Sequence, residues 1–83
     1  MRTAFKPAVL QALREKLLAA GQQPPDPSFK CIDFHASWSA WRVQLPSLIG
    51  KEILYFSFSD YGGSESALIQ AQYHRDDSFA KAG

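Results

Sequence analysis

The chain has 83 residues, of which 46% are hydrophobic and 20% are charged, a composition that is typical of one small globular domain and excludes a multidomain enzyme. A formal net charge of only +1 argues against avid nucleic-acid binding, because domains that bind nucleic acid avidly are usually strongly basic. The single cysteine, Cys31, excludes an internal disulfide framework and a Cys-rich zinc site. Since no apolar run approaches the length of a membrane span or a signal-peptide core, the sequence predicts a cytoplasmic protein that makes no membrane contact.

The first predicted element is an amphipathic helix, assigned to residues 1–21. Pro7 is tolerated in a first helical turn, and Gly21 suits the position just after a last one. The apolar residues between them follow helical spacing and form one stripe, which consists of Val9, Leu10, Leu13, Leu17 and Leu18. We expect such a stripe to be able to pair two copies of the chain into a homodimer.

Residues 22–28 are predicted to be a proline-rich linker. Pro24, Pro25 and Pro27 lack a backbone N–H and favour extended conformations in the residues before them. The segment is therefore neither a helix nor a central strand, and we predict a stiff connection between the first helix and the rest of the chain.

Beyond the linker, apolar and polar residues alternate in three stretches, as they do in half-buried strands. The apolar positions are Ile32, Phe34 and Ala36 in the first stretch, Trp41, Val43 and Leu45 in the second, and Leu54, Phe56 and Phe58 in the third. Residues 37–40 fit a short hairpin loop, and residues 46–51 fit a longer one. The pattern predicts an antiparallel meander of three strands.

A second helix is predicted after the sheet. Gly62 and Gly63 end the last strand region, Ser64 is the expected N-cap, and Glu65 suits the positive end of the helix dipole. The acidic residues at positions 76 and 77 oppose the dipole at the other end, so we expect fraying there and a loose tail over residues 78–83.

The predicted fold class is α+β: a three-stranded antiparallel sheet packed on a C-terminal helix, with an extra N-terminal amphipathic helix. The sheet and the last helix make up the main domain, residues 29–77. Trp41 is in phase with the apolar positions and is expected in the core, whereas Trp38 in the hairpin loop is expected to be exposed. Arg75 is expected to have a structural role, with its guanidinium reaching a carboxylate or a strand-end carbonyl.

A run of residues in the main domain is shared with a known family. It comprises Ile32-x-Phe34, Trp41-Arg42-Val43-x-Leu45, Gly50-Lys51, Phe56-Ser57-Phe58-x-x-Tyr61-Gly62 and Ala67-x-x-x-Ala71-x-x-x-Arg75-Asp76. The run resembles the APETALA-two/ethylene-response-factor DNA-binding domain, most closely the version in phage and bacterial integrases and homing endonucleases, over about residues 30–77. The resemblance implies three antiparallel strands on one helix, with the sheet lying in the DNA major groove.

The resemblance places the DNA contacts on the sheet face that points away from the last helix. Arg42 and Gln44 are suited to read base edges, because Arg pairs bidentately with guanine and Gln with adenine. Trp38 suits stacking on a sugar or lying against the backbone. Asp33 opposes DNA binding on the same face, since a carboxylate near phosphates is unfavourable unless it accepts from a cytosine amine. The expected DNA-binding residues are His35, Trp38, Arg42, Gln44, Lys51 and Tyr55.

Charge is divided unevenly along the chain. Residues 1–20 hold four basic residues and one acidic residue, a net of +3, whereas residues 21–83 hold five basic and seven acidic residues, a net of −2. Few cations in the family-like region predict weak, salt-sensitive DNA binding unless the first helix supplies phosphate contacts. The alternative is a protein-interaction domain on the same scaffold, whose neutral sheet face with Trp38, Ile53 and Tyr55 suits a protein partner.

Catalysis and metal binding are not expected. Cys31, Asp33 and His35 alternate along one strand, so their side chains diverge instead of converging on a metal ion. A Cys–His nucleophile would also need an oxyanion site, for which the sequence offers no candidate. We therefore predict no enzyme, no cofactor and no metal.

Overall fold

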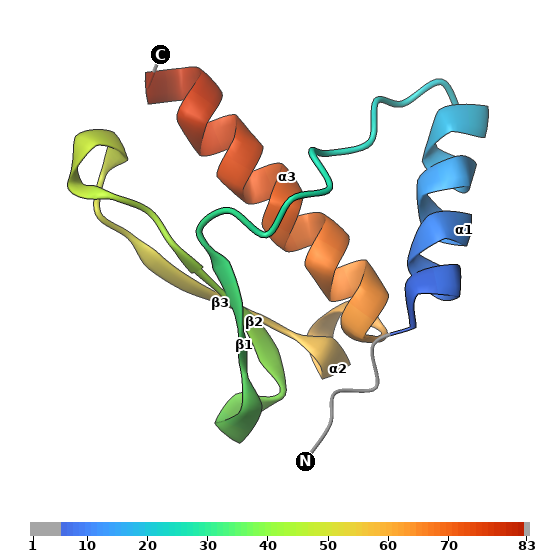
Figure 1. Ribbon diagram of the computed structural model, residues 1–83, viewed down its shortest axis with the longest axis horizontal. Coiled ribbons are helices and arrows are strands. Elements are labelled where there is room, and N and C mark those ends of the chain that lie inside the picture. The colour runs from blue at the N-terminus through green and yellow to red at the C-terminus, as the bar shows by residue number, and fades with distance from the viewer. Residues whose placement is uncertain (1–5, 83) are drawn as a thin grey trace.

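The computed structural model describes residues 6–82, and within this range it has the predicted α+β architecture (Figure 1). The elements are α1 (Pro7–Ala19), β1 (Ile32–His35), β2 (Ala40–Gln44), β3 (Ile53–Ser57), α2 (Phe58–Tyr61) and α3 (Ser64–Ala82). Short 3-10 turns, η1 (Ala36–Trp38) and η2 (Ser47–Ile49), lie in the two loops that connect the strands.

The sheet is an antiparallel meander in the order β1-β2-β3, which confirms the prediction from the alternating residues. Four predictions at strand ends were wrong. Ala40, expected in the hairpin loop, begins β2, and Leu45, expected in the second strand, lies just after its end. Ala36 belongs to η1, because the chain already turns there and closes the hairpin through Ser39 in a left-handed conformation at φ 46°. Phe58 begins α2, although its ring stays in the core, where it stacks on Phe34 at 5.8 Å. At Phe58, the alternation of apolar and polar residues cannot reveal a turn that leaves the apolar side chain in the core. Ala36, in contrast, is an apolar residue that lies exposed.

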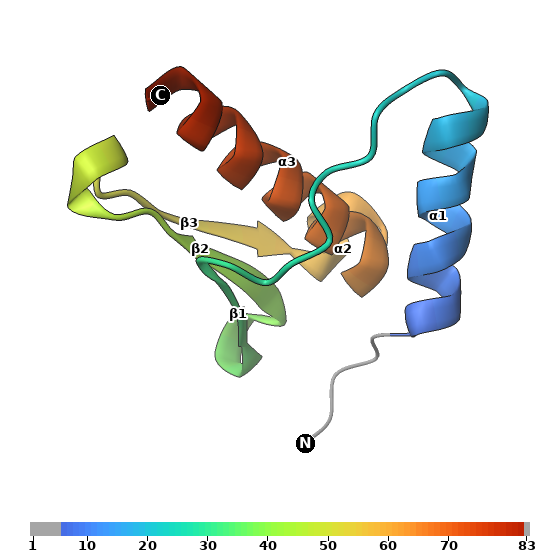
Figure 2. The same ribbon diagram turned by 45° about the horizontal axis from the view of Figure 1, so that its top comes forward.

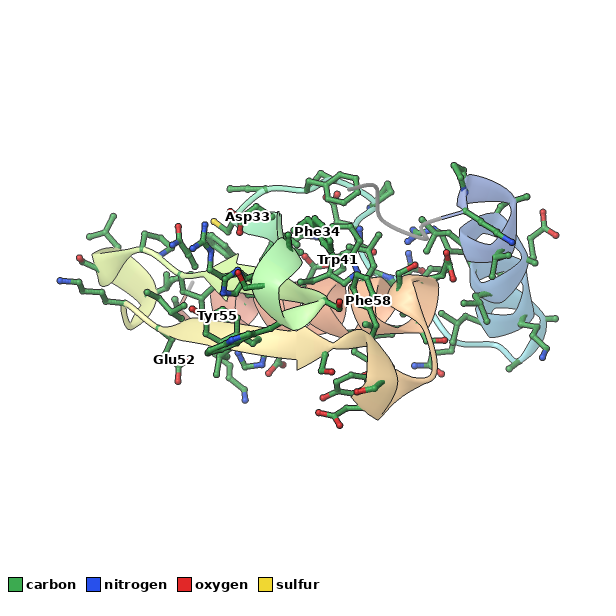
Figure 3. All side chains as sticks on the ribbon, turned by 90° about the horizontal axis from the view of Figure 1, so that it is seen from below. Asp33, Phe34, Trp41, Glu52, Tyr55 and Phe58 are labelled. Carbon is green, nitrogen blue, oxygen red and sulfur yellow. The ribbon has the colours of Figure 1, made fainter. Side chains whose placement is uncertain are left out.

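The core lies between the sheet and α3. Its buried members are Ile32, Trp41, Val43, Leu45, Ala67, Leu68 and Ala71. Ala67 and Ala71 have no exposed surface, and their small side chains let α3 approach the sheet closely. Trp41 is buried as expected and donates its Nε1–H to the carbonyl oxygen of Ser64 at 2.8 Å, which joins β2 to the start of α3. Figure 3 shows its ring grouped with Phe34 and Phe58.

The proline-rich segment crosses α3 on its way from α1 to β1 and packs against it (Figure 1). It is held there by Arg75, whose side chain is only 2% exposed. The Nη1 group donates to the carbonyl oxygens of Ser28 and Lys30, at 2.7 and 3.1 Å. The Nη2 group donates to the carbonyl oxygen of Asp26, at 2.9 Å. The structural role expected for Arg75 is confirmed.

The C-terminal region is helical where we predicted a loose tail. α3 continues through residue 82, so the fraying expected at residues 76–77 and the tail from residue 78 were wrong, and Gly83 lies outside the described residues. Asp76 accepts hydrogen bonds from the Arg75 Nε–H and from a backbone N–H of the linker, so its carboxylate is satisfied in spite of the helix dipole.

The last turns of α3 are held by two further contacts. Asp77 forms an ion pair with Lys81 one turn later, at 2.9 Å. Phe79 packs against the core, and the Nζ of Lys30 lies 4.6 Å from the centre of its ring. These side-chain contacts outweigh the unfavourable charge at the helix end, which is worth only about 0.3–1 kcal/mol at an exposed site.

α1 packs on α3 on the side away from the sheet, so that α3 separates the two (Figures 1 and 2). Leu10 reaches the core, but none of the residues of α1 is fully buried. An open hollow remains between α1 and α3, lined in part by Leu13, Leu17 and Ile69. The leucine stripe is thus only half covered, and the homodimer expected from it stays a prediction. Residues 1–5 of the predicted helix lie outside the described residues.

Glu65 attaches the start of α1 to the start of α3. Its Oε2 accepts the backbone N–H of Lys6 at 2.6 Å and the hydroxyl of Ser64 at 2.8 Å. Ser64 is thus the first helical residue and donates its hydroxyl to Glu65. Burial alone would raise the pKa of Glu65, but the Lys6 N–H, the Ser64 hydroxyl and its own backbone N–H together lower that pKa below its ordinary value.

Replacing Arg75 should destabilise the whole domain. In R75M the carbonyl oxygens of Asp26, Ser28 and Lys30 lose their donor while they remain partly buried, so we expect a loss of about 3 kcal/mol or more in the free energy of unfolding. Urea denaturation followed by circular dichroism measures this loss. K81M, which removes an exposed cation from the same helix, should change stability by less than about 0.5 kcal/mol. Equal effects of the two variants would contradict the assigned role.

Glu65 should make stability depend on pH. Because its pKa is lowered on folding, the carboxylate stabilises the fold above the unfolded-state value of about 4.3, and this contribution is lost as the pH falls through the folded-state pKa. E65Q should therefore be less stable than the wild type at neutral pH, and the difference should shrink in acid. Denaturation at a series of pH values tests this, with D60N as an exposed control. A difference that does not change with pH would refute the assignment.

Candidate functional site

The sheet face that points away from α3 carries most of the residues expected to bind DNA. Alternation along the strands turns Arg42, Gln44 and Tyr55 to this side of the sheet, together with His35 and Asp33. The strands are short and directly paired, so these side chains lie in rows across the sheet. We call this surface the outer face.

The central row of the outer face runs through Asp33, Arg42 and Tyr55, which are direct cross-strand neighbours. The Nε–H of Arg42 donates to one carboxylate oxygen of Asp33 at 3.0 Å, and its Nη2 donates to the other oxygen. The hydrogen bond to Asp33 raises the pKa of Arg42 above its ordinary value, with a smaller contribution from Tyr55. Arg42 is therefore a fixed cation whose charge is locally balanced.

Three aromatic rings gather beside this row. Trp38, in η1, contacts Tyr55 edge-to-face with a centroid distance of 4.5 Å, and the ring of His35 lies 5.1 Å from Trp38 and 5.2 Å from Tyr55. Trp38 is nonetheless 60% exposed, as the sequence predicted. The cluster holds Trp38 against the sheet and leaves much of its surface available to a ligand.

The far end of the outer face, near the β2–β3 loop, has a different character. Cys31, Gln44, Lys51 and Ile53 are among the residues that line an open hollow there. Lys51 has a left-handed backbone at φ 44°, and Ile53 is 55% exposed. Lys51 thus lies in the loop beside the sheet, while the other expected DNA-binding residues lie on β1, η1, β2 and β3.

The charge of the outer face is close to neutral. Asp33 and Arg42 cancel each other, and Lys51 adds one exposed cation. The basic side chains of α1 do not reach this face, because α3 separates α1 from the sheet (Figures 1 and 2). The phosphate contacts that the sequence left open for the first helix are therefore not made by the described part of α1 when a ligand lies on the outer face.

The candidate metal and catalytic residues of the sequence, Cys31, Asp33 and His35, are not grouped into a metal site. Among residues 6–82, no group of three or more His, Cys, Asp or Glu side chains is placed to hold a metal ion. Cys31 lies at a turn with φ 63°, and His35 is engaged with the aromatic rings. None of the helices in the described part of the chain is long and apolar enough to cross a membrane.

Sequence reasoning missed the ion pair between Asp33 and Arg42. It assigned both residues to one face but treated Asp33 only as an obstacle to DNA. The predicted loop over residues 37–40 would have placed Asp33 opposite Gln44, whereas the observed loop over residues 36–39 places it opposite Arg42.

Comparison of the chain with protein-family models, with curated proteins and with solved structures gives no match. The geometry and chemistry of the outer face are therefore the basis for assigning a function.

The two tryptophans should differ sharply in their contribution to stability. W41A removes a core ring and a buried hydrogen bond, so we expect a loss of about 3–5 kcal/mol. W38A removes an exposed ring whose main contacts are His35 and Tyr55, so we expect about 1 kcal/mol. Chemical denaturation measures both losses. A large loss in W38A would mean that the aromatic cluster belongs to the core and not to a binding surface.

Proposed function

We propose that the protein is a DNA-binding module that applies the outer face of its sheet to the major groove. The observation that carries the proposal is that Arg42, Gln44, Tyr55, His35 and Trp38 share one exposed face that neither α1 nor α3 covers. The family resemblance of residues 30–77 supports the same surface and the same mode of binding.

The dimensions of the outer face suit this role. The B-DNA major groove is about 12 Å wide and admits a two-stranded β-ribbon or a small sheet. Neighbouring strands lie about 4.8 Å apart, so the three strands present a surface of matching width. Arg42 and Gln44, two positions apart on the central strand β2, point the same way toward base edges.

The side chains around β2 would serve different purposes. Trp38 and Tyr55 offer aromatic surface for sugars or for the methyl group of thymine, and Lys51 offers a cation for a phosphate. With so little positive charge, the module would bind weakly on its own and would depend strongly on salt. This is the behaviour expected of one module within a larger DNA-binding assembly.

A protein partner is the second candidate, and one observation favours it. The outer face is near neutral and exposes Trp38, Ile53 and Tyr55, which are residue types typical of protein interfaces. A partner of this kind would present apolar surface to the aromatic cluster and would bind with little dependence on salt.

A titration with duplex DNA tests the first candidate. We expect a labelled random-sequence duplex pool to bind at about 50 mM salt and to dissociate at about 200 mM salt, as measured by fluorescence anisotropy. K51A should weaken binding and lower the slope of log K against log salt by about 0.9, the value for one lost phosphate contact. R42A should weaken binding of a sequence selected from the pool by about fivefold or more.

K16A is the matched control, since it removes a cation from α1 on the far side of α3. It should leave both the affinity and the salt slope unchanged. Absence of binding at about 50 mM salt would exclude the DNA-binding proposal, because electrostatic attraction is strongest at low salt. An equal effect of K16A and K51A would show that the ligand does not lie on the outer face.

A further inference from the structure

Asp33 binds only the side-on edge of the Arg42 guanidinium. The carboxylate accepts from Nε–H and from one hydrogen of Nη2, which is the side-on edge of the guanidinium. A guanidinium carries five N–H donors in a rigid plane, so Asp33 leaves three: both hydrogens of Nη1 and the second hydrogen of Nη2. The Tyr55 side chain also hydrogen-bonds the guanidinium. The end-on edge formed by Nη1 and Nη2 is therefore the edge that Asp33 leaves to a second bidentate partner.

That second edge is held in a defined direction. Asp33 and Tyr55 flank Arg42 from the neighbouring strands, and the side chain of Arg42 keeps 32% of its surface exposed. Without Asp33, a long Arg side chain would move among many rotamers and could turn toward any nearby phosphate. With Asp33, the guanidinium plane is fixed before a ligand arrives, which lowers the entropic cost of a directed contact.

The geometry of the edge formed by Nη1 and Nη2 matches the major-groove edge of guanine. The major-groove edge of guanine presents two acceptors, O6 and N7, which match two parallel N–H donors of one guanidinium. A phosphate could also accept from this edge, but the Asp33 carboxylate beside it, 50% exposed, would repel a phosphate. The pair thus disfavours backbone contacts by Arg42 and favours a contact with a base.

We propose that Asp33 is a positioning residue that makes Arg42 selective for guanine, at the expense of non-specific affinity. This inference rests on the DNA-binding function proposed above and extends it. In this role, Asp33 lowers the affinity for DNA of any sequence but raises the preference for a guanine at one position.

The test compares a guanine-containing duplex selected from a random pool by the wild-type protein with the same duplex carrying 7-deazaguanine, which lacks the N7 acceptor. The wild type should bind the 7-deazaguanine duplex about fivefold or more weakly, which corresponds to about 1 kcal/mol or more. D33N should bind the two duplexes alike and should bind the random pool more tightly than the wild type with a steeper salt slope, because a freed Arg42 can reach phosphates.

Three further variants complete the design. D60N removes an exposed carboxylate elsewhere in the chain and should keep the wild-type discrimination, which separates positioning from a simple change in net charge. R42A should lose the discrimination, and D33N/R42A should lose no more than R42A alone, as expected for residues that act as one unit. Thermal denaturation of each variant shows that the fold is retained.

The outcomes distinguish the two proposals. Guanine discrimination that survives in D33N, or a wild type that binds DNA but ignores 7-deazaguanine, would overturn the role of Asp33 and leave the DNA-binding function standing. A wild type that binds no duplex at about 50 mM salt would overturn the DNA-binding function, and the role of Asp33 with it.

Discussion

The fold depends on one buried guanidinium. Arg75, in the C-terminal half of α3, satisfies carbonyl oxygens of a segment whose prolines cannot join a helix or a sheet. The linker would otherwise leave these oxygens without a partner near the core. By holding residues 26–30 against α3, Arg75 also positions the chain just before β1, which begins at Ile32.

The outer face is left uncovered because of how the linker, α1 and α3 are arranged. α3 fills one side of the sheet with alanine and leucine, while the linker carries α1 around to the opposite side of α3 (Figure 1). β2, the central strand, therefore has a buried row of Trp41 and Val43 and an open row of Arg42 and Gln44. One alternating strand serves both the stability of the domain and the surface that we propose for binding.

Much of this could be predicted from the sequence because local periodicity determines it. The strands, their antiparallel order and the burial of Trp41 follow from alternation, and the structural role of Arg75 follows from the chemistry of a long cation on a packed helix. The continuation of α3 could not be predicted, because Phe79 and Asp76 are held by residues about 50 positions earlier in the chain. The link between Asp33 and Arg42 needed the exact pairing of two strands, which composition does not contain.

The position of α1 behind α3 gives the molecule two independent sides. A ligand lying on the sheet would leave the hollow beside Leu13, Leu17 and Ile69 uncovered, because the whole thickness of α3 and its core separates them. Occupancy of one side is therefore sterically compatible with occupancy of the other.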